Sequence, residues 1–299
     1  MYENSTPAAP LAGWHRKLLA AAAVFIVLLI AAGGVLCVTQ SIRSCPDWPG
    51  CFGRLLPPLE ASPILEFTHR TLAGTSGVLI LAAAVTGVAR ARRNRWILVP
   101  PLVAVVLLVE VSYFGAMVVL QGLTPGWAAV DVGSALLAVA LMVTAAVIAR
   151  HDPPGGLRFH SPLLKLALAA LAAVYVVLVS GILVAGKNFL TSCLGWPLYS
   201  LAQIQASAPG AGNILRLIIS VGAVGLILAV LVQAWRGRVA RPRVYGMARW
   251  VLAAFLLEAL LQAALLVFGF KLGLLIPYTI TMAFLWGTLA ALTAEAALE

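Results

Sequence analysis

Eight apolar runs of about 20 residues each constrain this chain more than any other feature of its sequence, because a helix of that length crosses roughly 30 Å of hydrocarbon. Of the 299 residues, 62% are hydrophobic and only 10% are charged, whereas soluble domains carry about 25% charged residues. These values exclude a soluble enzyme, a disordered chain and a nucleic-acid-binding domain. We predict an all-α integral membrane fold with transmembrane helices at about 18–39, 67–89, 96–120, 127–149, 163–186, 213–235, 250–270 and 277–297.

The distribution of basic residues predicts how the chain is oriented. Fourteen of the 20 Lys and Arg residues fall in the segments on the side that carries both termini. The positive-inside rule therefore predicts cytoplasmic termini in a multi-pass protein of the plasma or inner membrane. The apolar stretch from Leu18 to Thr39 is longer than the core of a signal peptide, so we expect it to stay as a helix. The net charge of +10 is then mainly a topological signal that also attracts anionic lipid, and no acidic partner is needed to explain it.

The chain resembles itself at an offset of 148 residues. The segment Ser44–Pro49 recurs as Ser192–Pro197, and the same offset relates Glu110 to Glu258 without a gap. This pattern indicates a tandem duplication of a four-helix unit, with the two copies related by a pseudo-two-fold axis near the membrane normal. The predicted organisation is a tail at 1–17, an N-terminal four-helix bundle at 18–150 that is the candidate catalytic half, a linker at 151–162 and a degenerate C-terminal bundle at 163–299.

Cys45 and Cys51 lie in the first long outer loop, within the segment CPDWPGC. An oxidising compartment and a short, proline-containing spacer favour a disulfide between them, with either a structural or a redox role. The second copy has Cys193 but carries Tyr199 at the position of the second cysteine. We therefore expect Cys193 to lack a partner in its loop, and we interpret Cys37 as a small packing residue of the first span.

His69 is the one histidine predicted to lie within a span. Glu66 precedes it by three residues, which places both side chains on one helical face. Ionisable groups within a span are costly, so a metal-binding or proton-transferring role is one interpretation. The other is an interfacial cluster in which Glu66 pairs with Arg70. The remaining histidines are predicted in cytoplasmic loops: His15, His151 and His160.

Asp131, Glu110 and Glu258 are further carboxylates that fall in predicted spans. Asp131 follows the short outer turn before the fourth span and either faces His69 across the bundle or acts as a helix-terminal carboxylate. Glu110 and its repeat partner Glu258 lie nearer the middle of the membrane. A single buried carboxylate of this kind is typically protonated and hydrogen-bonded between helices, so these two identify no reaction on their own.

Several motifs in this order resemble those of one known family. They are the CPDWPGC loop, the sequence Glu66-Phe67-Thr68-His69-Arg70 at the entry to the second helix, and the turn Gly122-Leu123-Thr124-Pro125 before the fourth. Together with eight helices in two fused bundles, they resemble the haem A synthase family of cytochrome oxidase biogenesis over nearly the whole chain.

The resemblance implies an oxidoreductase that converts haem O to haem A by oxidising a porphyrin methyl group to a formyl group. It implies Glu66 as the catalytic carboxylate, His69 as an axial ligand of the haem iron, and Cys45 and Cys51 as the assisting loop pair. The implied partners are the haem O substrate, haem O synthase, cytochrome oxidase assembly components and membrane lipid, with no nucleic acid.

The chain departs from this family at three of the four expected axial histidines. Asp131 stands where the first half would have its second histidine, so we predict that it contributes to haem binding, with water or an open position as alternatives. The repeat register sends His69 to Leu217, or to Leu215 in a shifted alignment, and sends Asp131 to Thr279. We therefore do not expect haem b bound between two histidines in the second half.

Two functions compete on these observations. One is a haem A synthase-like enzyme from a divergent branch, favoured because Glu66, His69 and the cysteine pair are all retained in one half. The alternative is a non-catalytic haem-binding or oxidase-assembly protein on the same scaffold, favoured by the lost histidines. A thiol–quinone oxidoreductase is disfavoured because Cys45 and Cys51 are not a closely spaced CxxC pair.

Overall fold

The fold is known from a computed structural model that describes residues 11–54, 56–91, 94–151, 157, 159–184, 193, 196 and 211–298. In this part of the chain, eight helices are long and apolar enough to cross a membrane, which confirms the predicted eight-span, all-α fold. The helices are α1 (Gly13–Val38), α2 (Ala61–Arg90), α3 (Arg95–Leu120), α4 (Pro125–His151), α5 (Pro162–Val184), α8 (Ala211–Arg236), α9 (Pro242–Phe268) and α10 (Leu272–Leu298).

Several helices begin before the hydropathy pattern does. The second helix starts at Ala61 rather than near residue 67, so Glu66 and His69 lie in its second and third turns rather than at its entry. The seventh starts at Pro242 rather than near residue 250, because proline at the first helical position favours an earlier start than the apolar residues indicate. Hydropathy alone detects the apolar part of a helix and misses its polar first turns.

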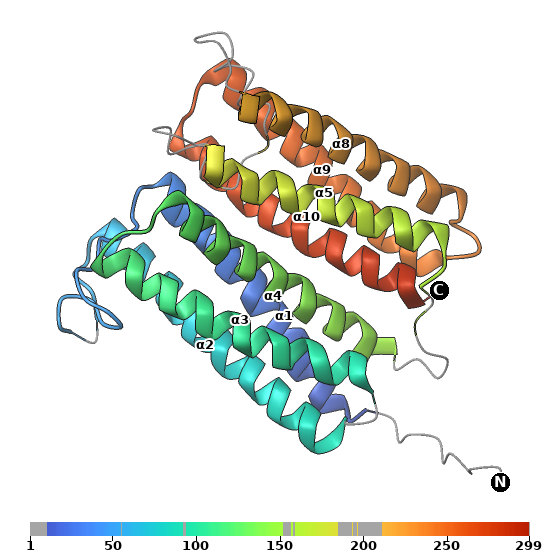
Figure 1. The fold of residues 1–299 in the computed structure, drawn as a ribbon, viewed down its shortest axis with the longest axis horizontal. Helices are drawn as coiled ribbons and strands as arrows, with labels where there is room; N and C mark the ends of the chain where they lie inside the picture. Colours follow the sequence, from blue (N-terminus) through green and yellow to red (C-terminus); the bar gives the residue numbers. More distant parts are fainter. Residues whose placement is uncertain are drawn as a thin grey trace.

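The helices form two groups in the order expected of a duplicated unit (Figure 1). In the first, α1 packs against α2 and α4, and α3 packs against the same two helices. In the second, α5 and α9 each pack against α8 and α10. The matched neighbours are compatible with the predicted pseudo-two-fold axis, which itself stays a prediction.

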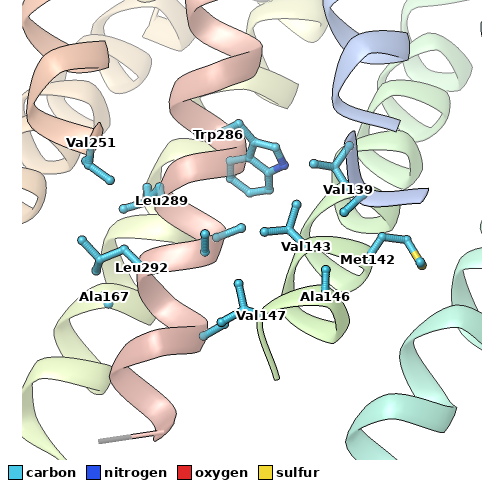
Figure 2. Close-up of a cluster of buried hydrophobic side chains, with 14 of the residues drawn as sticks. Val139, Met142, Val143, Ala146, Val147, Ala167, Val251, Trp286, Leu289 and Leu292 are labelled. Carbon is cyan, nitrogen blue, oxygen red and sulfur yellow. The ribbon is translucent and has the colours of Figure 1, made fainter. Parts of the chain in front are cut away.

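The two halves meet along α4 and α10, which are the most deeply buried helices, and α10 also packs against α1 (Figure 1). Trp286 of α10 is 2% exposed, and its indole N–H donates to the Leu136 carbonyl of α4 at 3.0 Å. Figure 2 shows it beside Val139 and Val143 of α4. At Gly34 of α1 an added Cβ would lie 2.9 Å from the Thr279 Cβ, so glycine permits the close approach of α1 and α10.

Two disulfides lie at the end of the bundles that is predicted to face outward. Cys45 and Cys51 are bonded within the first outer loop. Cys37 and Cys193 are also bonded, across a sequence separation of 156 residues. The expectation that Cys37 only fills space is therefore wrong, whereas Cys193 has its partner outside its own loop, in α1. Spacing arguments consider cysteines within one loop, whereas this pair forms because the fold brings the end of α1 beside the outer loop of the second half.

Candidate functional site

The outer loop that joins α1 to α2 is held in shape by Asp47. Its carboxylate accepts backbone N–H groups of Phe52 at 2.5 Å and Gly53 at 2.7 Å. Gly53 has a φ of +64°, a conformation that glycine adopts without strain. The hydrogen bond from Gly53, with that from Phe52 and the nearby charge of Arg70, lowers the pKa of the Asp47 carboxyl. The loop therefore depends on an ionised Asp47.

Glu66 anchors this loop to α2. It is 4% exposed, and its Oε2 accepts the Ser44 hydroxyl at 2.9 Å and the Cys45 backbone N–H at 2.7 Å. Its Oε1 pairs with the Arg70 guanidinium at 2.6 Å. Both carboxylate oxygens thus have partners, one set from the disulfide loop and the other from the next turn of the same helix. The ion pair that was one interpretation of this cluster is present.

Arg70 extends the same connection. Its guanidinium donates to the carbonyl of Asp47 at 2.6 Å and also to the carbonyl of Gly50. Together, Ser44, Cys45, Glu66 and Arg70 form what we call the loop clasp, which ties the Cys45–Cys51 disulfide loop over the outer end of the first bundle. The sequence identified Glu66 and Arg70, but Ser44 was missed because a lone serine in a loop carries no distinctive signal.

His69 points from α2 toward α1. An added Cβ on Gly33 would lie 3.3 Å from the His69 Cε1, so the missing side chain at Gly33 makes room for the ring. The ring also interacts with the Leu29 carbonyl, one turn earlier on the same face of α1. Its Nδ1 is buried, and no residue in the described part of the chain hydrogen-bonds to it. A buried nitrogen without a partner is suited to a ligand.

Asp131 interacts electrostatically with Glu110 and makes no described ion pair or hydrogen bond with His69. The charge of Glu110 on α3 acts on Asp131, whereas the charges that act on His69 are those of Glu66 and Arg70. Asp131 Oδ1 and Glu110 Oε1 are both buried, and neither has a hydrogen-bond partner among the described residues. The structure therefore gathers Glu66 and His69 with the cysteine loop, and gathers Asp131 with Glu110 at a second point of the first half.

The second half offers no histidine for an iron, because the sequence contains none after His160. Thr279, the repeat counterpart of Asp131, is fully buried against Gly34 of α1 and donates to the Ile276 carbonyl. The residues of this half do not fit a haem b held between two histidines.

The second half contains instead a buried polar cluster that sequence reasoning largely missed. Of its members, the sequence identifies only Glu258, through its repeat relation to Glu110. The signal that could have found the others is a polar residue within an apolar span, as at Gln262 and Arg216. The cluster consists of Trp196, Arg216, Glu258, Gln262 and Tyr278, each 6% exposed or less.

Two histidines differ from their predicted loop positions. His15 lies inside α1, fully buried, with its Nε2 3.3 Å from the Thr86 hydroxyl, because α1 begins five residues before the predicted span. His151 is the last residue of α4, and its Nε2 lies 2.9 Å from Glu295 of α10. These histidines help to join helices at the inner ends of the bundles.

Comparison with known proteins gives one family. The family model described as cytochrome oxidase assembly protein matches residues 62–290, more than half of the chain. A haem A synthase of Alkalihalophilus pseudofirmus is 26% identical over 256 residues, covering 83% of this chain and 82% of the relative. One of Halalkalibacterium halodurans is 25% identical, covering 68% and 70%. One of Bacillus licheniformis is 27% identical, covering 57% and 58%.

Proposed function

The chain belongs to the cytochrome oxidase assembly protein family that includes the haem A synthases, and from this membership we propose that it oxidises haem O to haem A in its first half. In this reaction a methyl group of the porphyrin becomes a formyl group, a four-electron oxidation whose co-reactant is an external oxidant, dioxygen or another electron acceptor. The observation that carries the proposal is the buried, unpartnered Nδ1 of His69 beside the loop clasp.

His69 is the proposed axial ligand of the substrate haem. The residues around it fit this role, because the ring has a nitrogen without a protein partner and Gly33 leaves room beside it. The bound haem iron would supply the oxidising chemistry. Asp131 is the proposed second residue of the site, since its Oδ1 is also buried and lacks a partner among the described residues.

Glu66 is the proposed catalytic carboxylate, and the clasp gives it a defined position. Hydrogen bonds from Ser44 and Cys45 and the ion pair with Arg70 fix its two oxygens. A carboxylate held in this way can take or return a proton at a constant place near the substrate. The Cys45–Cys51 disulfide orients the loop that carries two of these donors.

The family and the distribution of basic residues support proposals for the membrane orientation, the roles of the two halves and the partners. We propose that both termini are cytoplasmic, so that the clasp lies on the outer side, and that the linker at 151–162 joins a catalytic half to a half without haem b. Haem O synthase and cytochrome oxidase assembly components are the proposed partners. Because the second half would bind no haem, the whole chain would bind about one haem, in its first half.

A pigment analysis of purified protein tests this proposal. The full chain would be produced in cells that make haem O, purified in detergent, and its extracted haems separated and quantified. We expect haem O and haem A together, at about one haem per chain. His69→Ala should remove most of this haem while the protein still purifies as a folded membrane protein, because the side chain supplies the iron ligand and little packing.

The outcomes separate the two candidate functions. Bound haem O without haem A would contradict the enzyme and favour a haem-binding assembly protein, which the missing histidine partner of His69 also favours. A colourless protein, or haem that survives His69→Ala, would refute His69 as the ligand.

A further inference from the structure

The second half has buried polar groups that the proposed function does not use. Glu258 and Gln262 lie one turn apart on the same face of α9, and are 2% and 6% exposed. Both carboxylate oxygens of Glu258 and the amide oxygen of Gln262 lack hydrogen-bond partners within the described part of the chain. Three buried oxygens on one helix face therefore lack a hydrogen-bond partner among the described residues.

Tyr278 of α10 connects Gln262 to Trp196 through hydrogen bonds to its hydroxyl. The Tyr278 hydroxyl accepts the Gln262 amide at 3.2 Å and the Trp196 backbone N–H at 2.6 Å. The indole Nε1 of Trp196 is itself buried and unpartnered among the described residues. The cluster thus includes an unpartnered indole N–H on a residue that is linked to Gln262 through the Tyr278 hydroxyl, in addition to the oxygens on α9.

These unpaired polar groups make the cluster unfavourable unless a bound molecule supplies the missing hydrogen bonds. A buried polar group without a hydrogen bond costs roughly 1–3 kcal/mol in proteins, and native structures rarely leave several together. A metal cation is disfavoured, because the Arg216 guanidinium belongs to the same cluster and is 2% exposed, with its Nε donating to the Val177 carbonyl of α5. A haem iron would lack a histidine ligand here.

The chemistry of the free groups indicates the class of ligand. Acceptors on Glu258 and Gln262 call for hydroxyl or N–H donors, and the Trp196 indole calls for an acceptor. A hydroxyl group meets both needs, since it donates one hydrogen bond and accepts others. Side chains one helical turn apart are separated by about 5–6 Å at Cβ, which is comparable with the separation of the two hydroxyls across a hydroquinone ring.

We propose that the second half binds a membrane quinol through Glu258, Gln262 and Trp196. The quinol hydroxyls donate to the Glu258 carboxyl and the Gln262 amide oxygen, and the outer hydroxyl accepts from the Trp196 indole. Such a ligand reaches a site between membrane-spanning helices through the lipid. The site lies in the half that has no histidine for haem, so its occupancy is independent of haem binding at His69.

Binding of decylubiquinol to the purified full chain tests this proposal. Equilibrium dialysis in detergent, under anaerobic reducing conditions and corrected for partition into empty micelles, would measure the dissociation constant. We expect saturable binding of one quinol per chain. Glu258→Leu and Gln262→Leu should each weaken binding by about tenfold or more, since each removes a buried acceptor and every tenfold corresponds to about 1.4 kcal/mol.

The duplication provides a matched control. Glu110→Leu makes the same change at the repeat-related position in the other half and should leave quinol affinity unchanged within about twofold. The ubiquinol dimethyl ether, which lacks hydroxyl donors, should bind far more weakly than the quinol. Retention of the Cys37–Cys193 disulfide, measured by mass spectrometry, would show that each variant is folded.

Three results would overturn the proposal. Non-saturable uptake would mean that the polar groups bind only water. Equal loss of binding in Glu110→Leu and Glu258→Leu would indicate a general effect on the bundle. Equal affinity for the dimethyl ether would show that hydrophobic partition, and not the hydroxyl groups, accounts for the uptake.

Discussion

At the scale of single residues, Glu66 has a proposed catalytic role and a structural role, and a substitution of Glu66 affects both. Its carboxylate is the proposed catalytic group, and it also ties Ser44 and Cys45 of the disulfide loop to Arg70. Glu66→Gln would change the charge, the ion pair and the loop at once. A change in one donor to the carboxylate is therefore more informative than a change in the carboxylate itself.

Ser44→Ala makes that narrower change. It removes the hydroxyl donor to Glu66 Oε2 and leaves the Cys45 N–H and the Arg70 pair in place. Because one hydrogen bond to a charged group contributes about 1.5–3 kcal/mol, we expect turnover of haem O to fall by at least about tenfold while haem content is retained. The measurement is the ratio of haem A to haem O in extracts of purified protein.

Ser62→Ala is the control for this variant. Ser62 is a serine at the start of α2 whose hydroxyl accepts a hydrogen bond from the Ser41 hydroxyl, and its side chain makes no hydrogen bond to Glu66 among the described residues. Its replacement should leave the ratio near that of the unchanged protein. Equal ratios in Ser44→Ala and Ser62→Ala would argue that the position of the Glu66 carboxylate does not limit the reaction.

The residues that sequence analysis identified are those whose chemistry is costly in a membrane. Glu66 and His69 were chosen because ionisable side chains are rare in apolar spans. Ser44 and the Cys37–Cys193 pair were missed for a different reason. Their roles depend on where the chain returns in space, and no local spacing reports a bond between residues 156 positions apart.

At the scale of elements, the loop between α1 and α2 depends on one partly exposed carboxylate, that of Asp47. The pKa of Asp47 is lowered from its ordinary 3.8, first by the hydrogen bond from Gly53. A carboxyl with a lowered pKa in the folded state stabilises the fold above its unfolded pKa and loses that contribution as pH falls through the folded value. We therefore expect the loop to loosen only below about pH 4.

Hydrogen exchange measures this transition directly. After correction for intrinsic exchange rates, the amides of Phe52 and Gly53 should be protected at neutral pH and lose protection in the acid range. Asp47→Asn, which cannot ionise, should show weaker protection that does not vary through this range. Protection that depends equally on pH in Asp47→Asn and in the unchanged protein would mean that the carboxylate does not hold the loop.

The helices themselves were predictable and their ends were not. Hydropathy located all eight, because crossing hydrocarbon requires long apolar stretches. It placed the start of α2 too late, since it omitted residues 61–66, which end in Glu66, a carboxylate that the fold satisfies by an ion pair and by hydrogen bonds from the loop. The omitted turns therefore include the proposed catalytic carboxylate, whereas His69 and Arg70 lie within the predicted span.

At the scale of the whole molecule, the two halves are joined by packing and by a covalent bond. The interface along α4 and α10 uses close contacts such as Gly34 against Thr279, together with the hydrogen bond from Trp286. At the end predicted to face outward, the Cys37–Cys193 disulfide links the end of α1 to Cys193 of the second half. The linker at the inner side is therefore not the only connection between the halves.

Cutting that linker would test the second connection. A protease site inserted between His151 and Ser161 would allow the purified protein to be cleaved once on the inner side. On a non-reducing denaturing gel the two halves should still migrate as one species, and they should separate when a reductant is added. Cys193→Ser should separate without reductant, whereas Cys51→Ser should not, because its bond lies within one half. Halves that separate without reductant in the unchanged protein would contradict the disulfide and leave packing alone to join them.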